Sequence, residues 1–150
     1  MKFQTILAGI VLSAVAVCSR ADLTPYKDYE ISDVVWYVTT VKVAPNMGDL
    51  YLEGLKRTLL RGIEVQKKLG HIEDFKIFAS DFPSSGDFNL MLWVQYKNTA
   101  ELAPSKAKFD AFMKEFGEQE IKETTEYSQK NYPEIREITG DYLLREITLK

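Results

Sequence analysis

The 150-residue sequence predicts an α+β fold in which an antiparallel sheet carries helices on one face. Two observations predict it. Residues 34–43 are almost all β-branched or aromatic, with Lys42 as the only charge, which is typical of a strand covered on both faces. Two segments with helical spacing of apolar residues, 46–69 and 104–116, alternate with three further strand-like segments.

The start of the chain has the pattern of a secretory signal peptide. Lys2 gives a positive n-region, residues 3–17 form an apolar run, and residues 19–21 place small side chains where a signal peptidase cleaves. The run is shorter than the roughly 20 apolar residues of a membrane-spanning helix. We therefore expect a signal peptide over residues 1–21 and a periplasmic or secreted protein.

Cleavage after Ala21 would leave 150 − 21 = 129 residues, the size of one domain. The only cysteine, Cys18, would be removed, so the mature chain could form no disulfide. Loss of Lys2 and Arg20 would change the formal charge from −3 to −5, which disfavours a nucleic-acid partner. A lipoprotein signal acylated at Cys18 is the alternative, although Val17 stands where a small residue is usual.

The first half of the chain divides into an arm, a strand and a helix. Residues 22–33 are polar and are expected to form a mobile leader arm. The strand 34–43 ends at Pro45, and the helix 46–69 ends at Gly70. The stripe of this helix that is expected to be buried comprises Leu52, Leu55, Leu59, Ile63, Gln66 and Leu69.

Two strands follow this helix. They cover residues 72–80 and 89–96, and the loop 81–87 between them is rich in Pro, Ser, Gly and Asp. Because the connection is short, we expect an antiparallel hairpin.

The second half of the chain repeats the alternation of helix and strand. Pro104 suits the first turn of a helix, and a more polar helix over 119–131 is expected to end at Pro133. The last strand begins near Ile135 and is expected to break or bulge at Gly140. The first of these helices has an apolar stripe of Phe109, Phe112, Met113 and Phe116.

The order of strand, helix, strand, strand, helix and strand is the ferredoxin-like, or split βαβ, arrangement, which we assign to residues 34–150. Three local patterns resemble the dimeric α/β-barrel superfamily, whose branches include antibiotic-biosynthesis monooxygenase-like and NIPSNAP-like proteins. These patterns are Val41-Lys42-Val43-x-Pro45, Tyr51-Leu52-x-x-Leu55-Lys56 and Lys67-Lys68-x-Gly70. The resemblance covers residues 34–116 and the last strand, and implies a homodimer with a ligand pocket between sheet and helices.

Aromatic residues on three strands, together with those of the second long helix, could enclose a small apolar or aromatic ligand. The candidate ligand-binding residues are Tyr37, Trp93, Phe112, Tyr142 and His71. Tyr142 and His71 would supply polar atoms at the mouth of the pocket. The same aromatic residues could instead fill an ordinary core.

No metal or cofactor is expected. With His71 as the only histidine and no cysteine in the mature chain, zinc and copper lack nitrogen and sulfur ligands. Haem-using members of the superfamily generally take their axial ligand from a histidine on a later helix, and residues 105–118 contain none.

Three functions remain open, because no catalytic set is recognisable. The first is an exported small-molecule-binding barrel whose reaction is unassigned. The second is a cofactor-independent monooxygenase-like or isomerase-like enzyme acting on an aromatic or polyketide-like compound. The third is a non-catalytic structural or stress-related envelope protein.

Overall fold

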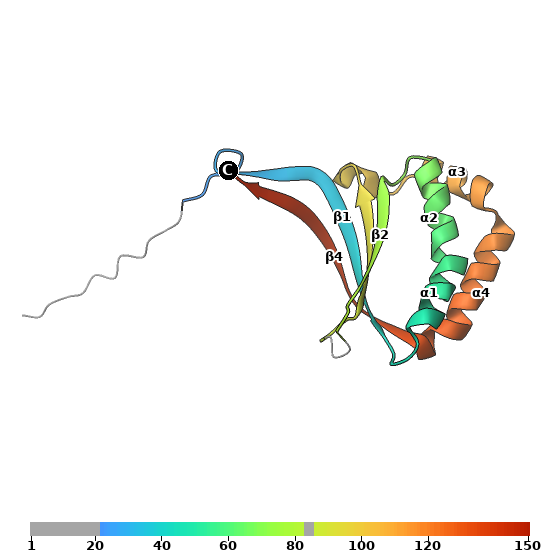
Figure 1. Ribbon diagram of the computed structural model, residues 1–150. Coiled ribbons are helices and arrows are strands. Elements are labelled where there is room, and N and C mark those ends of the chain that lie inside the picture. The colour runs from blue at the N-terminus through green and yellow to red at the C-terminus, as the bar shows by residue number, and fades with distance from the viewer. Residues whose placement is uncertain (1–21, 83–85) are drawn as a thin grey trace, which may run out of the picture.

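The computed structural model describes residues 22–82 and 86–150 (Figure 1). The predicted signal peptide, residues 1–21, lies outside the described residues. The elements in chain order are β1 (Tyr29–Val43), α1 (Gly48–Arg57), α2 (Leu59–Lys68), β2 (Asp74–Ala79), β3 (Leu90–Tyr96), the 3-10 helix η1 (Thr99–Leu102), α3 (Lys106–Phe116), α4 (Glu118–Ile135) and β4 (Arg136–Leu149). The strands form one antiparallel sheet in the order β2-β3-β1-β4, so the predicted ferredoxin-like arrangement is confirmed.

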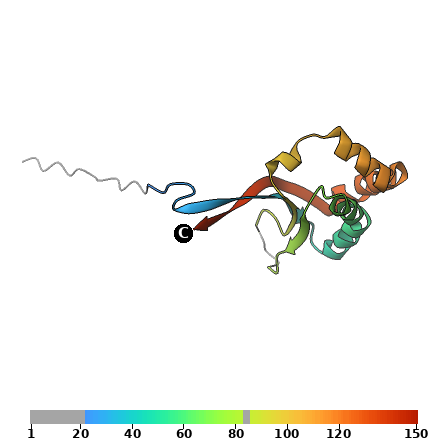
Figure 2. The ribbon, with the colours of Figure 1, turned by 90° about the horizontal axis from the view of Figure 1, so that it is seen from above.

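Helices α1 to α4 all lie on one face of the sheet (Figures 1 and 2). The core lies between the two layers, because alternate residues of each strand point toward the helices. Its buried residues are Val41, Val43, Tyr51, Leu55, Leu90, Tyr132 and Ile135. In the described part of the chain, no helix covers the opposite face of the sheet.

Strands β1 and β4 continue past the sheet as a two-stranded ribbon (Figure 1). Strand β1 begins at Tyr29, where it pairs with Leu149, and Ile31 pairs with Ile147. The prediction of a mobile arm over residues 22–33 is therefore wrong for its last five residues, 29–33, which are part of β1. They are ordered because β4, at the other end of the sequence, supplies their partners.

The predicted irregularity at Gly140 is confirmed as a bulge in β4. Thr40 pairs with Gly140 but Val41 pairs with Ile138, so Thr139 is an extra residue. The Thr139 hydroxyl donates to Thr40 Oγ1 at 2.9 Å, and that of Thr40 donates to the Gly140 carbonyl at 3.2 Å. The bulge changes which residues of β4 point toward the helices, from even-numbered residues before it to odd-numbered residues after it.

The predicted helix over residues 46–69 is divided into α1 and α2 at Thr58, whose φ and ψ of −107° and −65° distort the helix there. The stop at Gly70 is confirmed, since this glycine has φ +68°. The backbone N–H of His71 donates to the Gln66 carbonyl at 2.9 Å, and that of Gly70 donates to the Lys67 carbonyl at 3.0 Å. These two bonds form a Schellman motif, which ends α2.

Two expectations about proline are wrong. Pro104 precedes α3, which begins at Lys106 and has Ser105 as its N-cap, with the Lys108 N–H donating to the Ser105 hydroxyl at 3.3 Å. Pro133 does not end α4, which continues to Ile135. A proline so near the end of a helix removes one backbone hydrogen bond and leaves its final residues able to continue.

Candidate functional site

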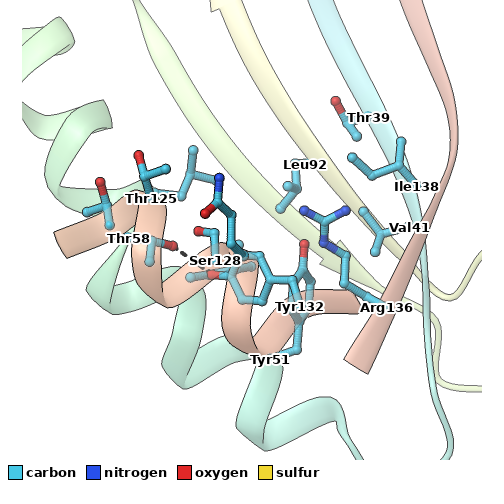
Figure 3. Close-up of a pocket in the computed structure, with 14 residues that line it drawn as sticks. Thr39, Val41, Tyr51, Thr58, Leu92, Thr125, Ser128, Tyr132, Arg136 and Ile138 are labelled. Atoms are coloured by element: carbon cyan, nitrogen blue, oxygen red, sulfur yellow. Dashed lines mark hydrogen bonds between the residues drawn. The ribbon is translucent and has the colours of Figure 1, made fainter. Parts of the chain in front are cut away.

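A cavity of about 400 Å³ lies between the sheet and helices α1 and α4 (Figure 3). Its apolar wall is made of Val41, Leu55, Leu59, Leu92 and Ile138. Its other lining residues carry polar groups and are Thr39, Tyr51, Thr58, Thr124, Thr125, Ser128, Gln129, Tyr132 and Arg136. An apolar space with a few convergent polar groups is the usual form of a small-molecule site.

Helix α4 brings polar side chains to this cavity. Thr124, Ser128 and Tyr132 recur at intervals of four residues, so they share one face of the helix, and all three line the cavity. The sequence predicts a polar helix here, but no role for it was expected. The recurring hydroxyl residues were the signal that could have identified its face.

Two buried tyrosines lie beside the cavity. The rings of Tyr51 and Tyr132 meet edge to face, with centroids 5.4 Å apart. The Tyr132 hydroxyl lies 2.6 Å from Thr58 Oγ1, and the Thr58 hydroxyl donates to the Gly54 carbonyl at 2.9 Å. Because a threonine hydroxyl has one proton, Tyr132 must be the donor in its bond to Thr58.

Both phenols are protonated at neutral pH. Burial raises the pKa of Tyr51 to about 12, although the nearby Arg136 guanidinium opposes that rise. Burial also raises the pKa of Tyr132. These hydroxyls therefore suit hydrogen bonding better than proton abstraction.

Arg136 is the first residue of β4, and its guanidinium points into the cavity (Figure 3). The guanidinium carbon lies 5.0 Å from the ring centroid of Tyr132 and 6.0 Å from that of Tyr51. Its Nε is buried and has no hydrogen-bond partner in the described part of the chain. Arg136 was not among the predicted ligand-binding residues.

The structure does not bring the five predicted ligand-binding residues together. Trp93 and Tyr142 both lie beside Val38, on the face of the sheet that the helices leave uncovered. Leu92, next to Trp93, points toward the helices and lines the cavity, so Trp93 must point the other way. The prediction that Trp93 and Tyr142 line a pocket between helices and sheet is therefore wrong.

Tyr37 is on the helix-facing side but outside the lining of the cavity. It is 38% exposed and pairs with Val94 and Leu143 on the neighbouring strands. Burial, followed by its hydrogen bond to Asp141, raises the pKa of the Tyr37 phenol.

His71 and Phe112 meet in a second, smaller cavity of about 310 Å³ between α2, α3 and η1. Lys108 forms an ion pair with Glu101 there, and its hydrogen bond holds the pKa of Glu101 below the usual range. The backbone of His71 caps α2, as described above, which accounts for its place at this end of the helix. The other lining residues are Gln66, Tyr96, Leu102 and Phe109.

Neither a metal-binding cluster nor a membrane-spanning helix occurs among the described residues. Within residues 22–82 and 86–150, no three His, Cys, Asp or Glu side chains gather closely enough to hold a metal ion. Over the same ranges, no helix combines the length and apolar character that crossing a membrane requires.

The fold and the first cavity define a ferredoxin-like α+β protein with a semi-polar pocket between sheet and helices. No protein-family model matches the chain, and no curated protein sequence matches it significantly.

Several solved structures match the chain in fold. A protein of Shewanella oneidensis matches with TM-score 0.47 and 12% identity, over 81% of this chain and 99% of that one. A protein of Bacteroides fragilis, described as dimeric, of unknown function and ferredoxin-like, matches with TM-score 0.42 and 11% identity, over 81% and 100%. An uncharacterised NIPSNAP-like domain protein of Burkholderia xenovorans matches with TM-score 0.42 and 18% identity, over 79% and 85%. These similarities concern the fold alone.

Proposed function

We propose that the protein is an exported homodimer that binds a small, largely apolar molecule in the cavity between the sheet and helices α1 and α4. The observation that carries the proposal is the cavity itself, whose volume of about 400 Å³ and apolar wall suit such a ligand. The hydroxyl groups of α4 and the Arg136 guanidinium would orient the molecule inside it.

Ligand binding is tested with two variants of one cavity-lining residue. Ser128→Phe should fill the space, whereas Ser128→Ala removes only the hydroxyl and leaves the cavity open. Aromatic and aliphatic compounds are screened by thermal unfolding, because a ligand that binds only the folded state stabilises it. The stabilisation is about 2.7 kcal/mol when the free ligand concentration is 100 times Kd. We expect stabilisation of the wild type and Ser128→Ala, and little of Ser128→Phe. Equal stabilisation of both variants, or none of the wild type by any compound class, would contradict the proposal.

The homodimer proposal is supported by the sheet face that the helices leave uncovered. This face carries many apolar side chains, namely Trp36, Val38, Phe78, Met91, Trp93, Tyr142 and Leu144. Trp93 packs edge to face against Trp36 and Phe78, with centroids 5.6 Å and 5.3 Å away. Phe78 remains 44% exposed and Tyr142 51% exposed. A continuous apolar patch of this kind is typical of an interaction surface, and a second copy would cover it.

Phe78→Asp tests the dimer without removing a buried side chain. A carboxylate within an apolar interface would be desolvated, so we expect this variant to be a folded monomer. Phe109→Asp is the control, because Phe109 is 61% exposed and lies on α3, on the helical side of the molecule. Light scattering at micromolar concentration gives the molar mass. A monomeric wild type, or a dimeric Phe78→Asp, would contradict the proposal.

Export rests on the pattern of residues 1–21 alone. The intact mass of protein recovered from the periplasm or the medium should correspond to a chain beginning at Asp22. A mass that includes residues 1–21, or one carrying a lipid on Cys18, would contradict cleavage after Ala21.

A further inference from the structure

We propose that the molecule bound in the first cavity carries a carboxylate, and that Arg136 binds it. This inference rests on the proposed function and adds the chemical class of the ligand. Arg136 is the only charged residue among the described residues that line the cavity, and its guanidinium points into the space (Figure 3).

The surroundings of Arg136 leave its charge without a counter-ion. Within residues 22–82 and 86–150, no Asp or Glu forms an ion pair with it. Arg136 is half-buried, and a partly desolvated cation is costly unless an anion or hydrogen-bond acceptors compensate it. Its partners are neutral: a side-chain hydrogen bond joins it to Tyr51, and the rings of Tyr132 and Tyr51 lie near it, but none of these groups carries a negative charge.

The geometry favours an acceptor in the plane of the guanidinium. The Nε–H is buried and lacks a partner in the described part of the chain, so one in-plane donor is unsatisfied. An arginine fork binds a planar carboxylate through two parallel hydrogen bonds. A single guanidinium also balances a single negative charge, which suits a monocarboxylate better than a dianionic phosphate.

The rest of the cavity indicates what the carboxylate is attached to. Leu55, Leu59 and Leu92 supply an apolar wall, and Ile138 lies beside Arg136 on β4. A ligand that satisfied both parts of this cavity would have an apolar body, aliphatic or aromatic, and one carboxylate at its end. This combination defines a small amphipathic monocarboxylic acid.

The test compares acids with their uncharged amides. Octanoate and octanamide form one pair, and 4-phenylbutanoate and 4-phenylbutanamide form the other, so that each pair shares its apolar body. Titration calorimetry on the mature protein should show the acid of at least one pair binding about tenfold or more tightly than its amide, as expected for hydrogen bonds to a charged group.

Arg136 variants assign the preference to this side chain. Arg136→Gln should bind acid and amide equally, and Arg136→Lys, which keeps the charge but loses the fork, should keep only part of the preference. Lys122→Gln is the matched control, because Lys122 is an α4 cation outside the cavity, paired with Glu126 at 3.9 Å, and it should behave as the wild type.

The outcomes separate the inference from the proposed function. If the wild type binds both members of a pair equally, the cavity is a ligand site but the carboxylate assignment is wrong. If the acid preference survives in Arg136→Gln, another group provides it and the assignment to Arg136 is wrong. If the wild type binds neither acid nor amide but is stabilised by an uncharged compound in the thermal screen, the cavity is a ligand site and the carboxylate assignment is wrong. If circular dichroism shows that Arg136→Gln does not fold, the salt dependence of binding to the wild type replaces this variant. Added salt should weaken the binding of the acid and leave the binding of the amide unchanged, and equal salt dependence of the two would contradict the inference.

Discussion

Helices α1 and α4 contact each other at Gly54, so this glycine should not tolerate even one added methyl group. A Cβ at this position would lie 2.9 Å from Tyr132 Cε1 and 3.2 Å from the Tyr132 hydroxyl oxygen. The ring cannot withdraw easily, because it is 7% exposed, packs on Tyr51 and donates its hydroxyl proton to Thr58. Gly54→Ala must therefore displace a buried, hydrogen-bonded side chain.

The size of the effect follows from opposing contributions. Alanine is better than glycine inside a helix by about 0.5–1 kcal/mol, which favours the variant. Overpacking a well-filled contact costs about 1–3 kcal/mol, and loss of the hydrogen bond between Tyr132 and Thr58 would add about 1 kcal/mol. We expect Gly54→Ala to lower the free energy of unfolding by about 1–3 kcal/mol.

Gly62→Ala is a matched control for Gly54→Ala. Gly62 lies inside α2, and its added Cβ would meet Phe112 Cζ at 3.8 Å, which is an ordinary contact. Only the helix preference then remains, so this variant should gain about 0.5–1 kcal/mol. Urea unfolding followed by tryptophan fluorescence, at one protein concentration, measures both. The reasoning is refuted if Gly54→Ala is as stable as Gly62→Ala.

Three further predictions follow from the described contacts. The contribution of protonated Tyr51 to stability should be complete below its unfolded pKa of 10.0 and be lost as the pH rises through about 12. Denaturant titrations of Tyr51→Phe should show a smaller loss of stability at alkaline pH, and a pH dependence equal to that of the wild type would contradict this prediction. Asn89→Ala removes two hydrogen bonds to the Val43 backbone, at 2.7 Å and 2.8 Å, and should lower the free energy of unfolding by about 1–3 kcal/mol. An unchanged free energy of unfolding would contradict this prediction. Phe112→Ala should cost less than the roughly 3–5 kcal/mol of a fully buried phenylalanine, because Phe112 is half-buried and stacks on Phe116 at 5.0 Å; a loss within that range would show that Phe112 is a core residue.

Local patterns in the sequence predicted the fold well where they act through neighbouring residues. The run of β-branched residues in β1 and the stop at Gly70 depend on local backbone preferences, and both are confirmed. Residues 29–33 form part of β1 because they pair with β4, which lies at the far end of the chain. No local sequence pattern contains that pairing. At the break, the Thr58 hydroxyl donates to the Gly54 carbonyl four residues back and accepts from Tyr132 of α4, and the spacing of apolar residues contains neither contact.

The candidate site was less predictable because it depends on strand register. Choosing Trp93 and Tyr142 required knowing which residues of β3 and β4 point toward the helices. A shift of one residue reverses the side to which each side chain points, and the bulge at Thr139 makes such a shift inside β4. Arg136 was overlooked because it stands at a junction between helix and strand, where periodicity gives no signal.

The ribbon of β1 and β4 also brings the two ends of the described chain together, at its tip and away from the helices (Figure 1). The Lys150 N–H donates to the Asp28 carbonyl at 3.0 Å, and the Lys150 ammonium lies 2.7 Å from a Glu30 carboxylate oxygen. Adjacent ends are the geometric condition for circular permutation. A short linker across the tip, with new ends opened in the loop between β2 and β3, should preserve the sheet order. A label or surface tether placed at either end would emerge from the same point and leave the cavity accessible.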